Sequence, residues 1–189
     1  MEAPSRRQVL GSLTALLTGA SGCLGSDSGG TPTPTVTEQS WPNSTDSPAA
    51  RTVRNPAGTP AVRSSLADHR IEHRSTHWIV TAETERAALD FPSATVGRDA
   101  ARAFVDETDL GSETLVVHQY EVNACETWDL QRLKWGEYGD RVPLTEIQLR
   151  YEDVDREGAC QRDGPKHVAA TLLRVPKRID RLGGFGYQV

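Results

Sequence analysis

The sequence has one methionine, Met1, and only three cysteines among its 189 residues. Small exported blue-copper sites need a cysteine followed closely by histidine and usually by methionine. The first histidine after Cys125 or Cys160 is His167, seven residues beyond Cys160, which excludes that class. No C-x-x-C pair is present either, and this excludes thioredoxin-like redox chemistry.

Lysine is nearly absent, with three residues in the chain, and the net charge is -5. Nucleic-acid binding requires a basic face, so we expect no nucleic-acid partner. The sequence also lacks a Gly-x-Ser-x-Gly motif and any serine or cysteine in a recognisable nucleophile context. We therefore predict a protein that is not an enzyme and needs no cofactor, with an enzyme whose site is unrecognised as the alternative.

The apolar run over residues 9–20 is shorter than the roughly 20 residues that span a bilayer. It follows the paired arginines Arg6 and Arg7, within the sequence SRRQVL of residues 5–10, and it leads to Ala-Ser-Gly-Cys at residues 20–23. Low hydrophobicity beside paired arginines distinguishes an export signal from a membrane anchor.

Residues 5–25 resemble the signals of lipoproteins exported by the twin-arginine route, a class common in haloarchaea. The resemblance implies that residues 1–22 are a signal peptide, with Arg6 and Arg7 as its export signal. It also implies lipidation of Cys23, which would hold the protein on the extracellular face of the cell membrane. The alternative is an ordinary N-terminus with a chance Arg-Arg pair.

Residues 23–65 are rich in Ser, Thr, Pro and Gly. Segments of this composition bury too little apolar surface to offset their chain entropy, so the sequence predicts a lipidated Cys23 followed by a disordered tether. Asn43 begins an Asn-Ser-Thr acceptor for glycosylation, and an exposed tether would suit that modification.

Residues 66–189 are long enough for one compact domain but too short for a two-lobed solute-binding protein. We expect a mainly β (α+β) fold: a small antiparallel β-sandwich or barrel with one or two short helices. Apolar residues alternate with polar ones over 145–152, which predicts a half-buried strand. Residues 168–175 are apolar on both faces, as in a central strand, and residues 78–80 and 185–187 are candidate edge strands.

Two further patterns concern strand faces. Val116, His118, Tyr120 and Val122 share one face of a predicted strand, with Leu115 and Val117 on the other. Between residues 127 and 135 the apolar phase slips by one residue, from Trp128 and Leu130 to Leu133 and Trp135. A slip of this kind predicts a β-bulge.

Residues 99–106 predict an amphipathic helix that buries Ala101, Phe104 and Val105, and residues 83–89 predict a weaker one. This helix is followed by a strand from Glu113, and the domain closes with Leu-Arg-Val-Pro at residues 173–176. That order of elements resembles small β-rich domains of protease-complex-associated proteins. It is also similar to haloarchaeal lipoproteins with a comparable cysteine pair. The resemblance implies a protease or another envelope component as partner.

With Cys23 assigned to lipid, Cys125 and Cys160 remain as an even pair on an exported domain, and we expect them to form a disulfide. The alternative is two free or metal-binding thiols.

His69, His73 and His77 recur every four residues. On a helix this spacing would align three imidazoles for zinc. The surrounding segment has almost no apolar face and leads into a predicted strand, so a solvated approach to that strand is the favoured interpretation. A metal-binding module remains the alternative.

Trp128, Trp135, Tyr120 and Tyr151 could form an aromatic binding surface, although in so small a domain they are more often core residues. His118 is expected to be a hydrogen-bonded core or rim histidine.

Together these observations predict a membrane-anchored extracellular lipoprotein. Its β-rich domain would bind a protein at the cell surface.

Overall fold

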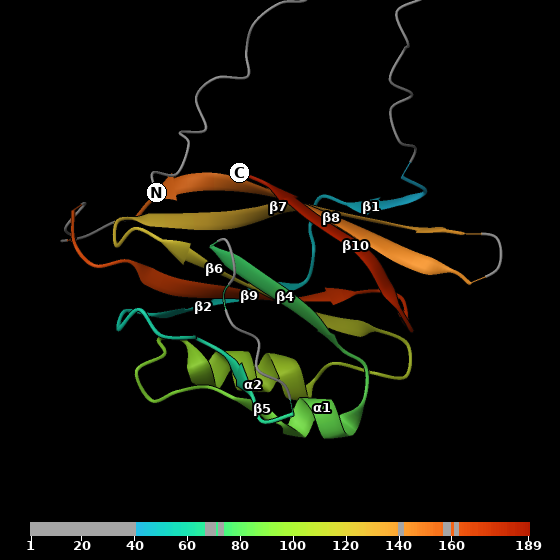
Figure 1. The fold of residues 1–189 in the computed structure, drawn as a ribbon, viewed down its shortest axis with the longest axis horizontal. Coiled ribbons are helices and arrows are strands. Elements are labelled where there is room, and N and C mark those ends of the chain that lie inside the picture. The colour runs from blue at the N-terminus through green and yellow to red at the C-terminus, as the bar shows by residue number, and fades with distance from the viewer. Residues whose placement is uncertain (1–40, 67–70, 72–73, 140–141, 157–159, 161–162) are drawn as a thin grey trace, which may run out of the picture. The chain divides into compact units, whose positions relative to one another are not determined.

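The computed structural model describes residues 41–66, 71, 74–139, 142–156, 160 and 163–189 (Figure 1). In chain order the elements are β1 (Asn43–Thr45), β2 (Ala50–Asn55), β3 (Arg63–Ser64), β4 (Ser75–Val80), α1 (Glu83–Ala87), β5 (Leu89–Asp90), α2 (Arg98–Asp106), β6 (Thr114–Val122), β7 (Glu126–Tyr138), β8 (Leu144–Asp155), β9 (His167–Val175) and β10 (Leu182–Gln188).

The strands form two four-stranded sheets. Sheet A has the order β1-β7-β8-β10 and sheet B the order β2-β9-β6-β4, while β3 and β5 form a separate short ladder. All pairs are antiparallel except β8 and β10, which run parallel. The expected mainly β fold is confirmed as a two-sheet arrangement with two short helices. Neither sheet closes into a barrel among the described residues.

Sheet B is the middle of three layers, with sheet A on one face and α1 and α2 on the other (Figure 1). Strand β6 shows why both faces of sheet B are covered. Val116 and Tyr120 pack with the core shared by the two sheets, whereas Leu115 and Val117 pack with the core under the helices. All four side chains are fully buried, as the predicted two-faced strand requires. Burial of each large apolar side chain contributes roughly 1.5–3 kcal/mol.

Helix α2 packs on sheet B through Ala101, Phe104 and Val105, the three residues expected from its apolar stripe. Its C-terminus is tied to β9 by Arg174, whose Nη2 donates to the carbonyl oxygen of Phe104 at 2.7 Å. The same guanidinium lies 4.1 Å from the centre of the Phe104 ring. A cation at this end of a helix also interacts favourably with the helix dipole.

The predicted β-bulge is present in β7. The register of β7 against β8 shifts between Leu130 and Arg132, so Gln131 is the extra residue. Leu133 and Trp135 keep their place in the inter-sheet core, and Leu130 packs against it on the other side of the shift. The bulge therefore restores the buried phase that the sequence pattern interrupts.

The ordered domain begins earlier than the sequence indicated, so the expected tether over residues 23–65 is too long. Residues 41–65 contain β1, β2 and β3. Composition misjudged this segment because three of its few apolar residues, Val53, Ala61 and Val62, are buried. The side-chain oxygen of Gln119 also accepts hydrogen bonds from the amides of Ala61 and Val62, at 2.8 and 2.9 Å.

A fragment of residues 41–189 should therefore show one cooperative urea-unfolding transition, whereas a fragment of residues 66–189 should show none. The shorter fragment lacks β2, which borders sheet B, and three buried side chains of the helix-side core. Near-ultraviolet circular dichroism during urea titration measures the difference. A native-like transition in the 66–189 fragment would show that the folded domain does not need residues 41–65.

Candidate functional site

Several residues predicted to act as signals or ligands lie outside the described residues. They are Arg6, Arg7, Cys23, His69 and His73. The export signal and the lipidated cysteine therefore stay predictions.

His77 lies in strand β4, so the helical spacing considered for a zinc site does not extend to this residue. Its ring stacks on Phe185 of β10, with centroids 4.1 Å apart. The burial of the ring lowers its pKa. Within the described ranges, no three His, Cys, Asp or Glu side chains come together as a metal site.

Asn43 lies in edge strand β1, where it is exposed and its Nδ2 donates to the carbonyl oxygen of Trp135 at 3.4 Å. It is thus part of the folded domain and not of a preceding tether. Its glycosylation stays a prediction.

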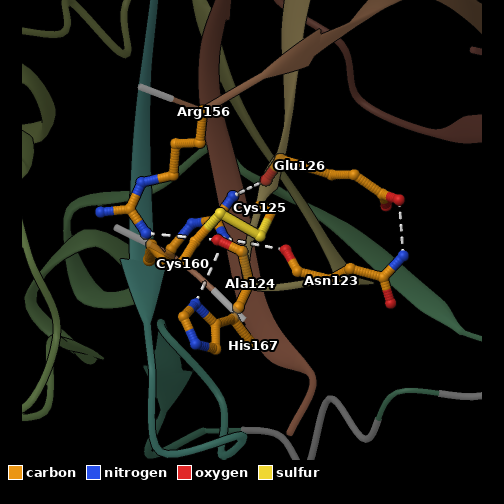
Figure 2. The surroundings of a disulfide bond; sticks show 8 residues. Asn123, Ala124, Cys125, Glu126, Arg156, Cys160 and His167 are labelled. Atoms are coloured by element: carbon orange, nitrogen blue, oxygen red, sulfur yellow. Dashed lines mark hydrogen bonds between the residues drawn. A yellow bond between two sulfur atoms is a disulfide. The ribbon is translucent and has the colours of Figure 1, made fainter. Parts of the chain in front are cut away.

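The expected disulfide between Cys125 and Cys160 is present, with an S–S distance of 2.07 Å (Figure 2). It joins the turn between β6 and β7 to the segment that follows β8. Main-chain contact reinforces this junction, because the amide of Arg156 donates to the carbonyl oxygen of Cys125 at 2.7 Å. Cys125 is buried and Cys160 is exposed.

The same turn surrounds the buried guanidinium of Arg54, which comes from β2. Its Nη1 donates to the carbonyl oxygens of Asn123 and Ala124 at 3.2 and 3.5 Å, and its Nη2 donates to that of Glu126. A buried cation is costly unless it is fully hydrogen-bonded. Burial and the nearby Arg156 lower the pKa of Arg54, yet an arginine keeps its proton. The carbonyls therefore both satisfy the cation and hold the disulfide turn against β2.

The contact with Arg54 also determines the tautomer of His167. Nη1 of Arg54 lies 3.2 Å from Nδ1 of His167. A guanidinium can only donate, so Nδ1 accepts and the proton of the neutral ring is on Nε2. Burial, Arg54 and Arg156 together lower the pKa of His167 and so disfavour protonation of the ring.

Replacing both disulfide cysteines by alanine should lower the free energy of unfolding by about 3 to 4 kcal/mol, because the bond closes a 35-residue separation in the unfolded chain. The fold should survive, since Arg54 still holds the turn. Urea unfolding of the oxidised wild type and the double variant measures the loss, with reduced wild type as the matched control. No change on reduction would contradict the assignment.

His118 is fully buried between the two sheets, as expected for a core histidine. Its Nδ1 and the hydroxyl oxygen of Tyr151 are joined by a hydrogen bond of 2.9 Å, while its Nε2 has no hydrogen-bond partner in the described part of the chain. Phe185 and Tyr187 of β10 lie against the ring, with centroids 5.1 and 4.6 Å away. Burial, with a smaller contribution from His77, lowers the pKa of His118 to about 3.

This shift makes stability depend on pH in a defined direction. Below about pH 6.5 the unfolded chain binds a proton at His118 that the native protein excludes until about pH 3. The contribution is therefore complete above pH 6.5 and is lost as the pH falls, by about 1.4 kcal/mol per unit.

Between pH 7 and pH 4.5, His118 should cost the wild type about 2 to 3 kcal/mol of unfolding free energy. A His118→Phe/Tyr151→Phe double variant removes both hydrogen-bonding partners and should lack that loss. Urea titrations at the two pH values give the difference between the proteins. Equal pH dependence in both would show that His118 is not the titrating group.

The four aromatic residues considered as a binding surface belong to the interior. Tyr120, Tyr151 and Trp135 are buried, and Trp128 is half-buried. Trp128 stacks on Tyr120 with ring centroids 4.3 Å apart. An exposed aromatic patch from Trp128 or Trp135 is therefore absent from the described domain, because both rings fill space between the sheets.

A polar groove of about 560 Å³ lies on sheet A in the part of the chain that the structure describes. It is lined by Asp46, Gln131, Arg132, Arg150, Tyr151, Glu152, Asp153 and Val189. The β-bulge places Gln131 in this groove, and the C-terminal end of β10 borders it through Val189. The volume lies within the range of ordinary ligand sites.

The groove contains both acidic and basic side chains, and some of them form no ion pair with another described residue. Arg132 and Arg150 are directly opposite each other on β7 and β8, an arrangement of like charges that is unfavourable by itself. Asp46 forms an ion pair with Arg132. Neither Arg150 nor Glu152 has an ion pair among the described residues. Burial, Glu126 and Asp155 raise the pKa of Asp153.

Sequence reasoning did not identify this groove. The alternation over residues 145–152 did mark Arg150 and Glu152 as outward-facing. The alternation could not show which residues lie beside them. The Arg132–Arg150 pairing depends on the register after the bulge, and Asp46 lies in a segment that was expected to be a tether.

No protein-family model matches the chain, and no curated protein or solved structure is significantly similar to it. Neither helix in the described part of the chain has the length and apolar character needed to cross a bilayer.

Proposed function

We propose that this protein is a non-enzymatic binding module that lipid on Cys23 holds at the outer face of the cell membrane. Its binding site would be the groove on sheet A. The observation that carries the proposal is the groove itself, in which Arg150 and Glu152 are exposed and lack an ion pair within the described ranges.

The composition of the groove favours binding over catalysis. None of the described lining residues is Ser, Thr, Cys, His or Lys, so this part of the groove lacks the hydroxyl or thiol nucleophile and the imidazole base that acyl transfer requires. The buried pair of His118 and Tyr151 is enclosed between the sheets. A substrate would have to separate the sheets to reach it.

The proposed anchor suits this role. With the domain beginning at Trp41, residues 23–40 can separate it from the membrane by at most about 60 Å. A module on such a tether meets partners at a high effective concentration near the same surface.

A photo-cross-linking amino acid in place of Gln131 tests the site in living cells. It should capture a discrete partner, because residue 131 lines the groove. The matched control places the same amino acid at Ala103, which is exposed on helix α2, and it should capture that partner at least tenfold less. Equal capture at the two positions, or capture at residue 103 alone, would contradict the proposal.

Cys23→Ser separates the anchor from the groove in the same experiment. Without the lipid, the protein should leave the membrane fraction, whereas the purified protein should still be cross-linked through residue 131 when mixed with membranes. If Cys23→Ser protein stays in the detergent-extracted membrane fraction, the anchor is not lipid on that residue.

A further inference from the structure

We propose that the groove on sheet A recognises an extended polypeptide segment that carries an acidic and a basic side chain at alternate positions. This inference rests on the proposed function and specifies the class of its partner. It depends on the charges that line the groove and on their spacing along β8.

Five of the eight described residues that line the groove are charged: Asp46, Arg132, Arg150, Glu152 and Asp153. The ion pair of Asp46 with Arg132 shows that an arginine in this part of the sheet can bind a carboxylate. Arg150 lies directly across from Arg132 and has no carboxylate of its own among the described residues. A carboxylate from a partner would satisfy Arg150 and relieve the repulsion between the two guanidinium groups.

Glu152 would bind the basic side chain of the partner. It is exposed, two residues beyond Arg150 on β8, and like Arg150 it has no ion pair within the described ranges. Side chains two residues apart share one face of a strand and are separated by about 6.6 Å. An extended peptide has the same repeat, so a Glu-x-Lys segment can place its carboxylate on Arg150 and its ammonium group on Glu152.

Other ligand classes fit the lining less well. Among the described lining residues, a polyanion would face three carboxylates against two guanidinium groups. Sugar rings favour exposed aromatic faces, whereas Tyr151 is the only aromatic residue in the described lining and its side chain is buried. An apolar ligand would find one aliphatic residue in the same described set, Val189.

The test uses the full-length protein in detergent and a fluorescent peptide of sequence Thr-Glu-Thr-Lys-Thr-Glu-Thr-Lys-Thr, with binding followed by fluorescence anisotropy at low ionic strength. Arg150→Glu and Glu152→Arg should each raise the Kd roughly tenfold, because each replaces an attraction by a repulsion. The charge-swapped double variant should bind within about threefold of wild type, since an alternating peptide can shift by two residues and meet the swapped charges.

Lys134→Glu is the matched control, because it makes the same change of charge on β7 but does not line the groove. It should leave the Kd within about twofold of wild type. Peptides with all lysines replaced by glutamate, or all glutamates by lysine, should bind roughly tenfold more weakly than the alternating peptide. Urea unfolding of each variant verifies that the fold is unchanged.

Several results would overturn the inference. Unchanged affinity in both single variants, failure of the double variant to recover binding, or preference for the all-glutamate peptide would each do so. So would concentration-dependent self-association that Arg150→Glu abolishes, since the groove would then bind a second copy of the chain. If position-131 cross-linking persists in any of these cases, the proposed binding site stands and only its charge specificity fails.

Discussion

The requirement to bury both faces of sheet B determines the rest of the architecture. Strands β6 and β9 are apolar on both sides, so one face needs sheet A and the other needs the helical layer. Sheet A, in contrast, has only one face in a core formed by described residues, and its opposite face carries polar side chains. The charged residues on that face, including Arg150 and Glu152, can therefore interact with a partner at little cost to the core.

Buried polar groups add specificity to this apolar framework. Gln119 uses its side-chain oxygen to hold the chain at Ala61 and Val62, and Arg54 holds the disulfide turn through three carbonyl oxygens. Each of these polar side chains would be costly in a wrong register, where its partners would be missing. In the described part of the chain, Nε2 of His118 and Nε2 of Gln119 are both buried without a hydrogen-bond partner. Of the two, only the imidazole can take up a proton, and because its burial lowers its pKa, acid weakens the fold at His118.

Sequence patterns predicted the elements whose burial follows a local period. The two-faced strand around Val116, the bulge near Gln131, the buried stripe of α2 and the Cys125–Cys160 bond are all confirmed. Strand β2 escaped prediction because an edge strand is held by main-chain hydrogen bonds to β9, which leave little trace in composition. The groove escaped for a similar reason. Its described residues lie in β7 and β8 or directly follow β1 and β10, and the register of the sheet brings them together.

We propose that the polar face of sheet A, and not the helical layer, would contact a partner at the cell surface. Carboxyl-group footprinting of the protein in native membranes, compared with the purified protein in detergent, tests this most directly. We expect that labelling of Asp46 and Glu152 falls in native membranes, while labelling of Asp99 and Asp106 on α2 is unchanged. Protection of Asp99 and Asp106, with full labelling of Asp46 and Glu152, would contradict it.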